Sequence, residues 1–309
     1  MPAPPPTVDF AARNTVVGRT PSDVQKYGEE GTGYIGKVVM SSGENPVLGR
    51  KVLMDMAKPH VILICGKRGG GKSFSCGIMI EEFSKLAPEI KKRTSLIVID
   101  MVGIFWTLKI PARGNENELL EWGLVPESIP VRVLVPQGKL AFYQEKEIPV
   151  DGPLTIRAGE MDITEWMALF RYTWHDPEAI LLGRVINDMK EKLGMRFGLD
   201  EIVLGITQDA EADGLTKQAL KNRVEMAKEW GLLEKEGTKI RDIAEAGKIT
   251  IIDVSAYRQA IGMEGTKDII VALLGKKLFE ERMLYRKEEE IRLMKGLGRE
   301  SQMPIVWMM

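Results

Sequence analysis

Residues 66 to 73 of this chain are GKRGGGKS. Gly66, four further residues and then Gly71-Lys72-Ser73 satisfy the pattern G-x-x-x-x-G-K-[S/T], in which backbone N–H groups cradle a phosphate. Glycines let consecutive N–H groups turn toward one anion, and a side chain there would block its approach. We therefore expect Lys72 to reach the β- and γ-phosphates of a nucleotide and the hydroxyl of Ser73 to hold Mg²⁺.

The sequence on either side of this loop supports the same interpretation. The run HVILIC at residues 60–65 is apolar and β-branched, which predicts a buried strand. After the loop, Phe74, Ile78 and Phe83 recur at helical spacing. A helix N-terminus placed directly after the loop supplies the positive end of a dipole to the phosphate. The alternative, a glycine-rich turn that contains Lys-Ser by chance, does not account for this order of strand, loop and helix.

The expected cofactors are ATP and Mg²⁺, with Lys72 as a catalytic residue and Ser73 as the metal ligand. Lys67 and Arg68 form a basic pair inside the loop, and we favour a solvent-facing position for them because Lys72 already serves the phosphates. The full set of expected nucleotide-binding residues is Gly66, Lys67, Arg68, Gly69, Gly70, Gly71, Lys72, Ser73 and Phe74.

Composition sets limits on the class of protein. The 309 residues carry 43 Lys and Arg against 44 Asp and Glu, a formal net charge of −1, so no overall basic field points to nucleic acid, although one face could still be basic. Cys65 and Cys76 flank the loop and are expected to be buried free thiols in a reducing compartment. His60 and His175 have no partner at ligand spacing, so a zinc site is not expected.

The chain shows no targeting or membrane pattern. The N-terminal MPAPPPTVDF lacks the charged and apolar segments of a secretory signal. No apolar run approaches the length that spans a bilayer. We therefore expect a soluble, cytoplasmic protein with no membrane partner.

Further apolar runs predict an α/β fold. Strands are expected at 34–40 and 51–54 around a turn at 41–45, and at 95–99, 131–135, 249–252 and 304–309, with a long helix from 268 to about 295. Apolar strands that do not alternate and are separated by helices indicate a mostly parallel sheet covered by helices on both faces. In such sheets ligands bind beyond the carboxyl ends of the strands.

Changes in sequence character along the chain predict four parts. Residues 1–32 contain Pro and Gly and are expected to be a disordered lead. Residues 33–160 are expected to form the first part of the nucleotide-binding core, 161–247 an inserted helical bundle, and 248–309 the second part of the core. The charges along the face from Lys276 to Arg292 are expected to be solvated, in preference to a contact with nucleic acid.

A nucleotide-hydrolysing site also needs an acid at the end of another strand. Asp100 and Asp253 each close an apolar run, and either fits this role on pattern alone. Each equally fits a turn residue that ends a strand. The third candidate is the run PIVWMM at 304–309, whose acid would come after Met309.

Several segments resemble the HerA-type ATPases of the HerA/FtsK superfamily, an archaeal DNA translocase group. They are YIGKVVM at 34–40 and KPHVILICGKRGGGKSFSCGIMIEEF at 58–83. LIVIDMVGIFW at 96–106 is similar to the family's second strand, and Met101 replaces its usual proline. The block 161–247 lies where the family carries an inserted helical bundle, and ITIIDVSAY at 249–257 also fits.

The resemblance implies a P-loop NTPase of RecA-like fold that forms a homohexameric ring around duplex DNA, with ATP between subunits. It implies helicase or translocase activity in DNA repair or end processing, with a NurA-type nuclease as partner. Asp100 is carried over as a catalytic residue. By the same resemblance PIVWMM is the Walker B strand, with its acidic pair after Met309, which puts ATP hydrolysis by this polypeptide in doubt.

Three functions follow from these observations. The first is the ATP-binding motor domain of a DNA translocase, and the second is a nucleotide-binding module that regulates or assembles with a partner without hydrolysis. The third, a small-molecule kinase, requires an arginine-rich lid. It is disfavoured because the arginines of the inserted block are scattered, at Arg171, Arg184, Arg196 and Arg223.

Overall fold

The computed structural model of the chain describes residues 14–41, 47–257, 266–298 and 303–309. Most of the expected turn at 41–45 and residues 1–13 of the expected lead lie outside these ranges. Residues 14–32 do not match a disordered lead, because they contain the short strand β1 (Thr15–Val17) and the helix α1 (Pro21–Tyr27). Thr20 caps α1 by accepting the backbone N–H of Asp23, with Pro21 at the first helical position.

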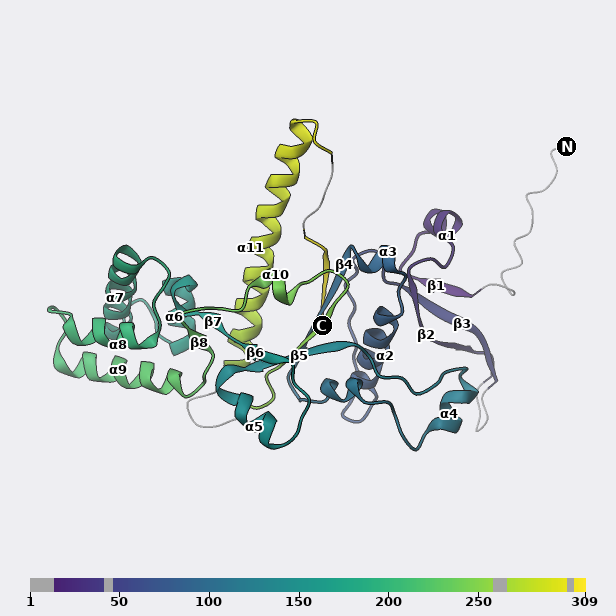
Figure 1. The fold of residues 1–309 in the computed structure, drawn as a ribbon, viewed down its shortest axis with the longest axis horizontal. Helices are drawn as coiled ribbons and strands as arrows, with labels where there is room; N and C mark the ends of the chain where they lie inside the picture. Colours follow the sequence, from purple (N-terminus) through teal and green to yellow (C-terminus); the bar gives the residue numbers. More distant parts are fainter. Residues whose placement is uncertain (1–13, 42–46, 258–265, 299–302) are drawn as a thin grey trace.

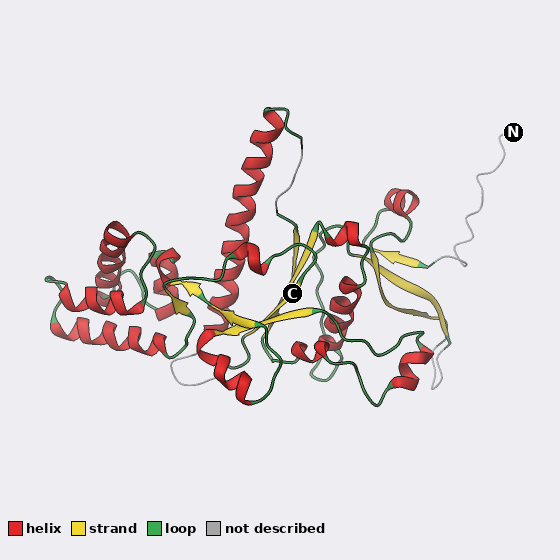
Figure 2. Ribbon diagram, in the orientation of Figure 1, coloured by secondary structure: helices red, strands yellow, loops and turns green. Residues whose placement is uncertain are grey.

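A five-stranded sheet forms the centre of the fold (Figures 1 and 2). Its strands run in the order β10-β4-β9-β5-β6, and every neighbouring pair is parallel. Their bounds are β4 Thr94–Asp100, β5 Val131–Pro136, β6 Gly152–Leu154, β9 Ile249–Asp253 and β10 Ile305–Met308. The expected α/β fold with a mostly parallel sheet is therefore confirmed, and four of its strands coincide with predicted apolar runs.

The two faces of this sheet belong to two different hydrophobic clusters. Along β4, Leu96 and Val98 enter one cluster and Ile97 enters the other, since successive side chains point to opposite faces. The first face packs against Ile80 and Phe83 of the helix α2 (Lys72–Ser84). The second packs against the long helix α11 (Thr266–Met294) and the helical block. Strands that are covered on both faces are apolar at most positions, which is why the runs could be found in the sequence.

The helical block between residues 161 and 247 lies to one side of the sheet (left in Figure 1). Its helices begin with clear signals. Asp162 and Glu165 form a capping box at the first helix, and Asp213 caps a later one. The helices are α6 Ile163–Phe170, α7 Pro177–Leu193, α8 Leu199–Gln208, α9 Gly214–Lys228 and α10 Ile240–Ile243. The block also contains a strand that was not predicted, β8 (Leu233–Glu234), which pairs with β7 (Ile156–Arg157).

A smaller sheet lies on the other side of α2 (right in Figure 1), in the order β1-β3-β2. The strands β2 (Thr32–Val39) and β3 (Leu48–Asp55) pair antiparallel and correspond to the two strands predicted around the turn. The remaining short elements are α3 Pro88–Lys91, α4 Glu116–Glu121 and α5 Leu140–Glu145, with 3-10 turns at Phe105–Lys109, Gln137–Lys139 and Ala158–Glu160.

One predicted strand is wrong. Residues 60–65 precede the glycine loop and belong to no strand, and Val61 and Leu63 are exposed, the latter by 86%. Strand propensity produces a strand only where a neighbour offers a free edge for pairing. The start of the segment lies close to β10, because the ring centroids of His60 and Trp307 are 5.9 Å apart.

The burial predicted for the two cysteines is also wrong. Cys65 lies on the exposed segment, and its side chain faces solvent. Cys76 lies on α2 and is only partly covered, although this partial burial raises the pKa of its thiol. Both are free thiols, as expected.

Candidate phosphate-binding site

The glycine loop ends at the N-terminus of α2, the thirteen-residue helix that begins at Lys72. The first turn of a helix leaves its backbone N–H groups without intrahelical acceptors, and the helix dipole adds positive potential there. The N-cap residue is Gly71, which provides no side-chain cap. The helix therefore presents N–H groups at the end of the loop, which is the geometry that binds phosphate in other proteins.

The backbone of the loop explains why it is rich in glycine. Gly69 and Gly71 have φ angles of 78° and 80°, in the left-handed region that glycine adopts without strain. A Cβ atom at either position would meet nothing within 4 Å, so open space lies beside both. At Gly70, by contrast, a Cβ atom would lie 3.1 Å from the carbonyl oxygen of Lys67, which accepts a hydrogen bond from the Gly70 N–H. The loop is thus turned tightly, with its two left-handed positions open to a ligand.

Lys72 closes the loop from the helix side. Its Nζ donates hydrogen bonds to the carbonyl oxygens of Gly66, at 2.8 Å, and Lys67, at 2.9 Å. The ammonium group is therefore held at the loop, where the phosphates of a nucleotide would lie. Ser73 is exposed one residue further along α2.

The remaining expected binding residues are all exposed. Lys67 and Arg68 face solvent, and Phe74 has 74% of its surface exposed. The structure thus brings the nine expected residues together in one loop and the first turn of one helix. Their contacts with a nucleotide stay a prediction.

Asp100, the expected catalytic acid, has a structural task at the end of β4. Its Oδ1 accepts the backbone N–H groups of Val102 and Gly103, and its Oδ2 accepts those of Ile104 and Phe105, at 2.7 to 3.0 Å. The side chain is 1% exposed. A carboxylate with four N–H partners organises the turn that follows its strand. Its catalytic role stays a prediction, and this geometry does not favour it.

Asp253 ends the neighbouring strand β9 in register with Asp100. Its Oδ1 accepts the N–H of Ser255, whereas its Oδ2 is buried and has no hydrogen-bond partner among the described residues. Burial raises the pKa of this carboxyl, and the nearby charge of Asp100 adds to the effect. Ser255 also lies 3.4 Å from the hydroxyl of Tyr143, whose pKa burial raises to about 12.

Gly103 packs closely against Ser255 and Asp253. It has a φ angle of 80°, and a Cβ atom there would lie 2.2 Å from the Ser255 hydroxyl oxygen. Neither strand-end aspartate therefore presents an accessible carboxylate oxygen. Across residues 14–41, 47–257, 266–298 and 303–309, no group of three or more His, Cys, Asp or Glu side chains is arranged to hold a metal ion. A magnesium ion bound through phosphates and a few protein oxygens, as is usual for nucleotide sites, fits the Ser73 hydroxyl.

A buried ion pair anchors the segment that leads into the loop, and it gave no signal in the sequence. Asp55 at the end of β3 is fully buried and accepts Arg19 at 2.9 Å. Its other oxygen lies 3.1 Å from Nε2 of His60. Arg19 lies 36 residues before Asp55 in the sequence, so only the folded structure shows that they form a pair.

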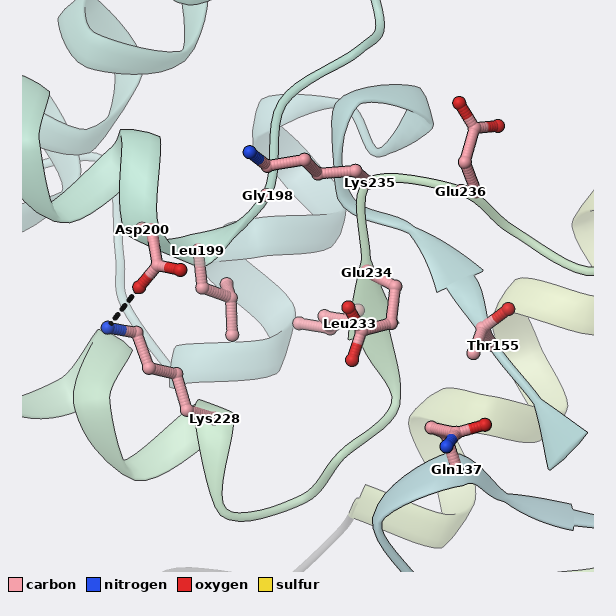
Figure 3. Close-up of a pocket in the computed structure, with 10 residues that line it drawn as sticks. All are labelled: Gln137, Thr155, Gly198, Leu199, Asp200, Lys228, Leu233, Glu234, Lys235 and Glu236. Atoms are coloured by element: carbon pink, nitrogen blue, oxygen red, sulfur yellow. Dashed lines mark ion pairs between the residues drawn. The ribbon is translucent and has the colours of Figure 1, made fainter.

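Away from the glycine loop, a cavity of about 560 Å³ lies beside the helices α8 and α9 and the β7-β8 pair (Figure 3). Most of the charged groups that line it are already paired. Lys228 contacts Asp200 at 2.7 Å, and Lys235 contacts Glu201 at 2.5 Å. None of the loop residues lines it. We therefore assign the candidate site to the loop and not to this cavity.

The loop at the N-terminus of α2 and the parallel sheet place the chain in the class of α/β P-loop proteins. The family profile "Helicase HerA, central domain" matches residues 34–278, which is most of the chain. The chain therefore belongs to this family, whose members are nucleotide-binding motor domains. The family resemblance inferred from the sequence is confirmed.

No curated protein matches the sequence. Among solved structures, VirB4 of Thermoanaerobacter pseudethanolicus is similar, with 15% sequence identity and a TM-score of 0.44. The match covers 82% of this chain and 65% of that one, so the chain spans less than two thirds of the VirB4 structure.

In the described part of the chain, no helix combines the length and the apolar character needed to cross a lipid bilayer.

Proposed function

We propose that this chain is the ATP-binding part of a motor that moves on duplex DNA. The observation that carries the proposal is the loop at 66–73, whose open left-handed glycines and uncapped helix N-terminus match the requirements of a phosphate. Membership of the HerA helicase family supports the link to DNA.

In this proposal each loop residue has a defined task. The N–H groups of Gly69, Gly71 and Lys72 bind the phosphate oxygens. The ammonium of Lys72 leaves the carbonyls of Gly66 and Lys67 and neutralises the β- and γ-phosphates. The hydroxyl of Ser73 holds Mg²⁺, which when bound offsets charge on the phosphates.

The wider assembly follows from the family and not from the geometry. We propose a homohexameric ring around duplex DNA, with a role in DNA repair or end processing, a NurA-type nuclease as partner and a cytoplasmic location. The net charge of −1 gives this no separate support.

A nucleotide-binding module that does not hydrolyse ATP is the second candidate. The state of the two strand-end aspartates favours it. Asp100 is occupied by four backbone N–H groups, and the free oxygen of Asp253 is buried. Neither carboxylate is presented to organise Mg²⁺ or to activate water.

An ATPase assay with and without duplex DNA separates the two candidates. For a translocase motor we expect hydrolysis that duplex DNA stimulates and that Lys72→Ala abolishes. Lys192→Ala is the control, because it removes an exposed lysine of α7 that lies outside the loop. Tight ATP binding without turnover, unchanged by DNA, would instead establish the non-hydrolysing module.

A further inference from the structure

A cavity of about 300 Å³ lies between α2, β2 and the region of α4 (Figure 1). Apolar and aromatic side chains make up much of its wall, namely Ile35, Phe74, Ile78, Leu119, Trp122 and Leu124. The ring of Phe74 is largely exposed, and that of Trp122 is partly exposed. Lys37 lies over the Trp122 ring at 4.9 Å, so only the rest of that side chain is open to the cavity. The surface suits an apolar segment that packs flat against aromatic side chains.

The charged residues that line this cavity are all acidic. Glu81 and Glu82 both pair with Lys85. Glu118 is exposed and has no ion pair in the part of the chain that the structure describes. These carboxylates disfavour an acidic segment in the cavity, because like charges repel.

The N-terminal segment of the chain, residues 1–13, has the composition that such a surface accepts. It reads MPAPPPTVDFAAR and lies outside the described residues. Four of its first six residues are proline. Proline-rich segments favour the extended polyproline II conformation, and they dock in aromatic-lined grooves with little loss of conformational entropy. Its charges are Arg13 and the N-terminal ammonium against Asp9, so the segment is not acidic.

The N-terminal segment joins the described chain close to the cavity. Thr15 of β1 pairs with Val52 of β3, and Val52 pairs with Gly36 of β2, which lines the cavity. Neighbouring strands lie about 4.8 Å apart, so Thr15 and Gly36 are about 10 Å apart. Residues 7–13 span up to about 23 Å when they are extended. The prolines at 2–6 can therefore reach the cavity of the same chain.

We propose that the proline-rich residues 2–6 dock in this cavity of their own chain. The proline rings pack against Phe74 and against the open part of Trp122. Because the segment is tethered, its effective concentration at the cavity is in the millimolar range, and a weak contact is enough to keep it bound. Phe74 directly follows Ser73, so the docked segment lies beside the glycine loop.

Fluorescence anisotropy of a labelled peptide of residues 1–13 tests the proposal on the full chain. The peptide is titrated with the unaltered chain and with a triple variant that carries Pro4→Ala, Pro5→Ala and Pro6→Ala. We expect the triple variant to bind the peptide at least about tenfold more tightly, because the tethered segment of the unaltered chain competes for the cavity. A peptide with the same three replacements should bind neither form.

Two further replacements in the triple variant locate the site. Phe74→Ala and Trp122→Ala should each weaken peptide binding at least about fivefold, since an aromatic anchor of the groove is lost. The large exposure of Phe74 makes its replacement safe for the fold. Trp174→Ala is the matched control, because Trp174 is an exposed tryptophan of the helical block that does not line this cavity, and it should leave peptide binding unchanged.

Three results would overturn the proposal. Equal peptide binding by the unaltered chain and the triple variant would show that the tethered segment does not occupy the site. Absence of binding to both would show that the cavity does not accept the segment. A dimer of the unaltered chain that the triple replacement dissociates, measured by size-exclusion chromatography with light scattering, would place the segment in a second copy instead of its own chain.

Discussion

Asp100 and Asp253 show how two similar residues acquire different states from their surroundings. Both end strands of one parallel sheet in the same register, and both are almost fully buried. Asp100 is satisfied by four N–H groups. Asp253 keeps one unpaired oxygen and has a raised pKa because of burial. Desolvation disfavours the charged form of a carboxyl, which is why burial raises the pKa of Asp253.

The raised pKa of Asp253 predicts a stability that depends on pH. A carboxyl group with a raised pKa binds its proton more tightly in the folded state than in the unfolded state. The folded protein therefore loses stability as the pH rises from the unfolded pKa of the group, about 3.9, through its higher folded pKa. Asp253→Asn removes this loss. We expect its melting temperature to equal or exceed that of the unaltered chain at pH 7, with the difference shrinking toward pH 4.

Asp209→Asn is a control of opposite sign. In the unaltered chain, the hydrogen bond from Arg184 lowers the pKa of Asp209 to about 2. The contribution of Asp209 to folding stability is therefore present above about pH 4 and is lost between about pH 4 and pH 2. This variant should melt at a lower temperature at pH 7. A marked loss of stability in Asp253→Asn at pH 7 would contradict the account, because it would mean that Asp253 is charged and paired in the folded state.

At the scale of elements, the segment before the loop behaves differently from what its composition indicates. HVILIC has the composition of a buried strand, yet Val61 and Leu63 are exposed, and no strand in the part of the chain that the structure describes pairs with the segment. Local propensity was a poor guide because strand formation depends on what lies beside the segment. The buried cluster of Arg19, Asp55 and His60 holds its start.

This exposure predicts that the segment tolerates charge. Val61→Lys and Leu63→Lys should each change the free energy of unfolding by no more than about 0.5 kcal/mol, as surface substitutions usually do. Ile80→Ala, which empties a fully buried position on α2, should cost about 2–5 kcal/mol. Chemical denaturation of the three variants measures this. A cost of several kcal/mol for either lysine would show that the segment is a buried strand in solution.

Some charges on the long helix α11, which were expected to be solvated, form ion pairs with the helical block. Lys276 contacts Asp162 at 2.6 Å and Glu165 at 2.9 Å, so this part of the charged face connects α11 to the capping box of α6. Lys277 pairs with Glu160. These charges attach the helical block to the core, a role that the spacing of charges along one helix cannot reveal.

At the scale of the whole molecule, the sequence predicted the parts of the fold that have a local signal. Strands buried on both faces, such as β4 and β9, are mostly apolar runs, and the glycine loop has a fixed residue pattern. The short strands β6, β7 and β8 were missed, because two or three residues carry no pattern. Contacts between distant parts of the chain, such as that of Arg19 with Asp55, could not be predicted at all.

The central claim for the molecule is that residues 66–73 bind the phosphates of ATP. The most direct test is an equilibrium titration of the purified chain with Mg-ATP, beside Lys72→Ala and the control Lys192→Ala, which changes an exposed lysine of α7. We expect saturable binding that is lost in Lys72→Ala and kept in Lys192→Ala. Equal ATP affinity in the unaltered chain and in Lys72→Ala would contradict the claim.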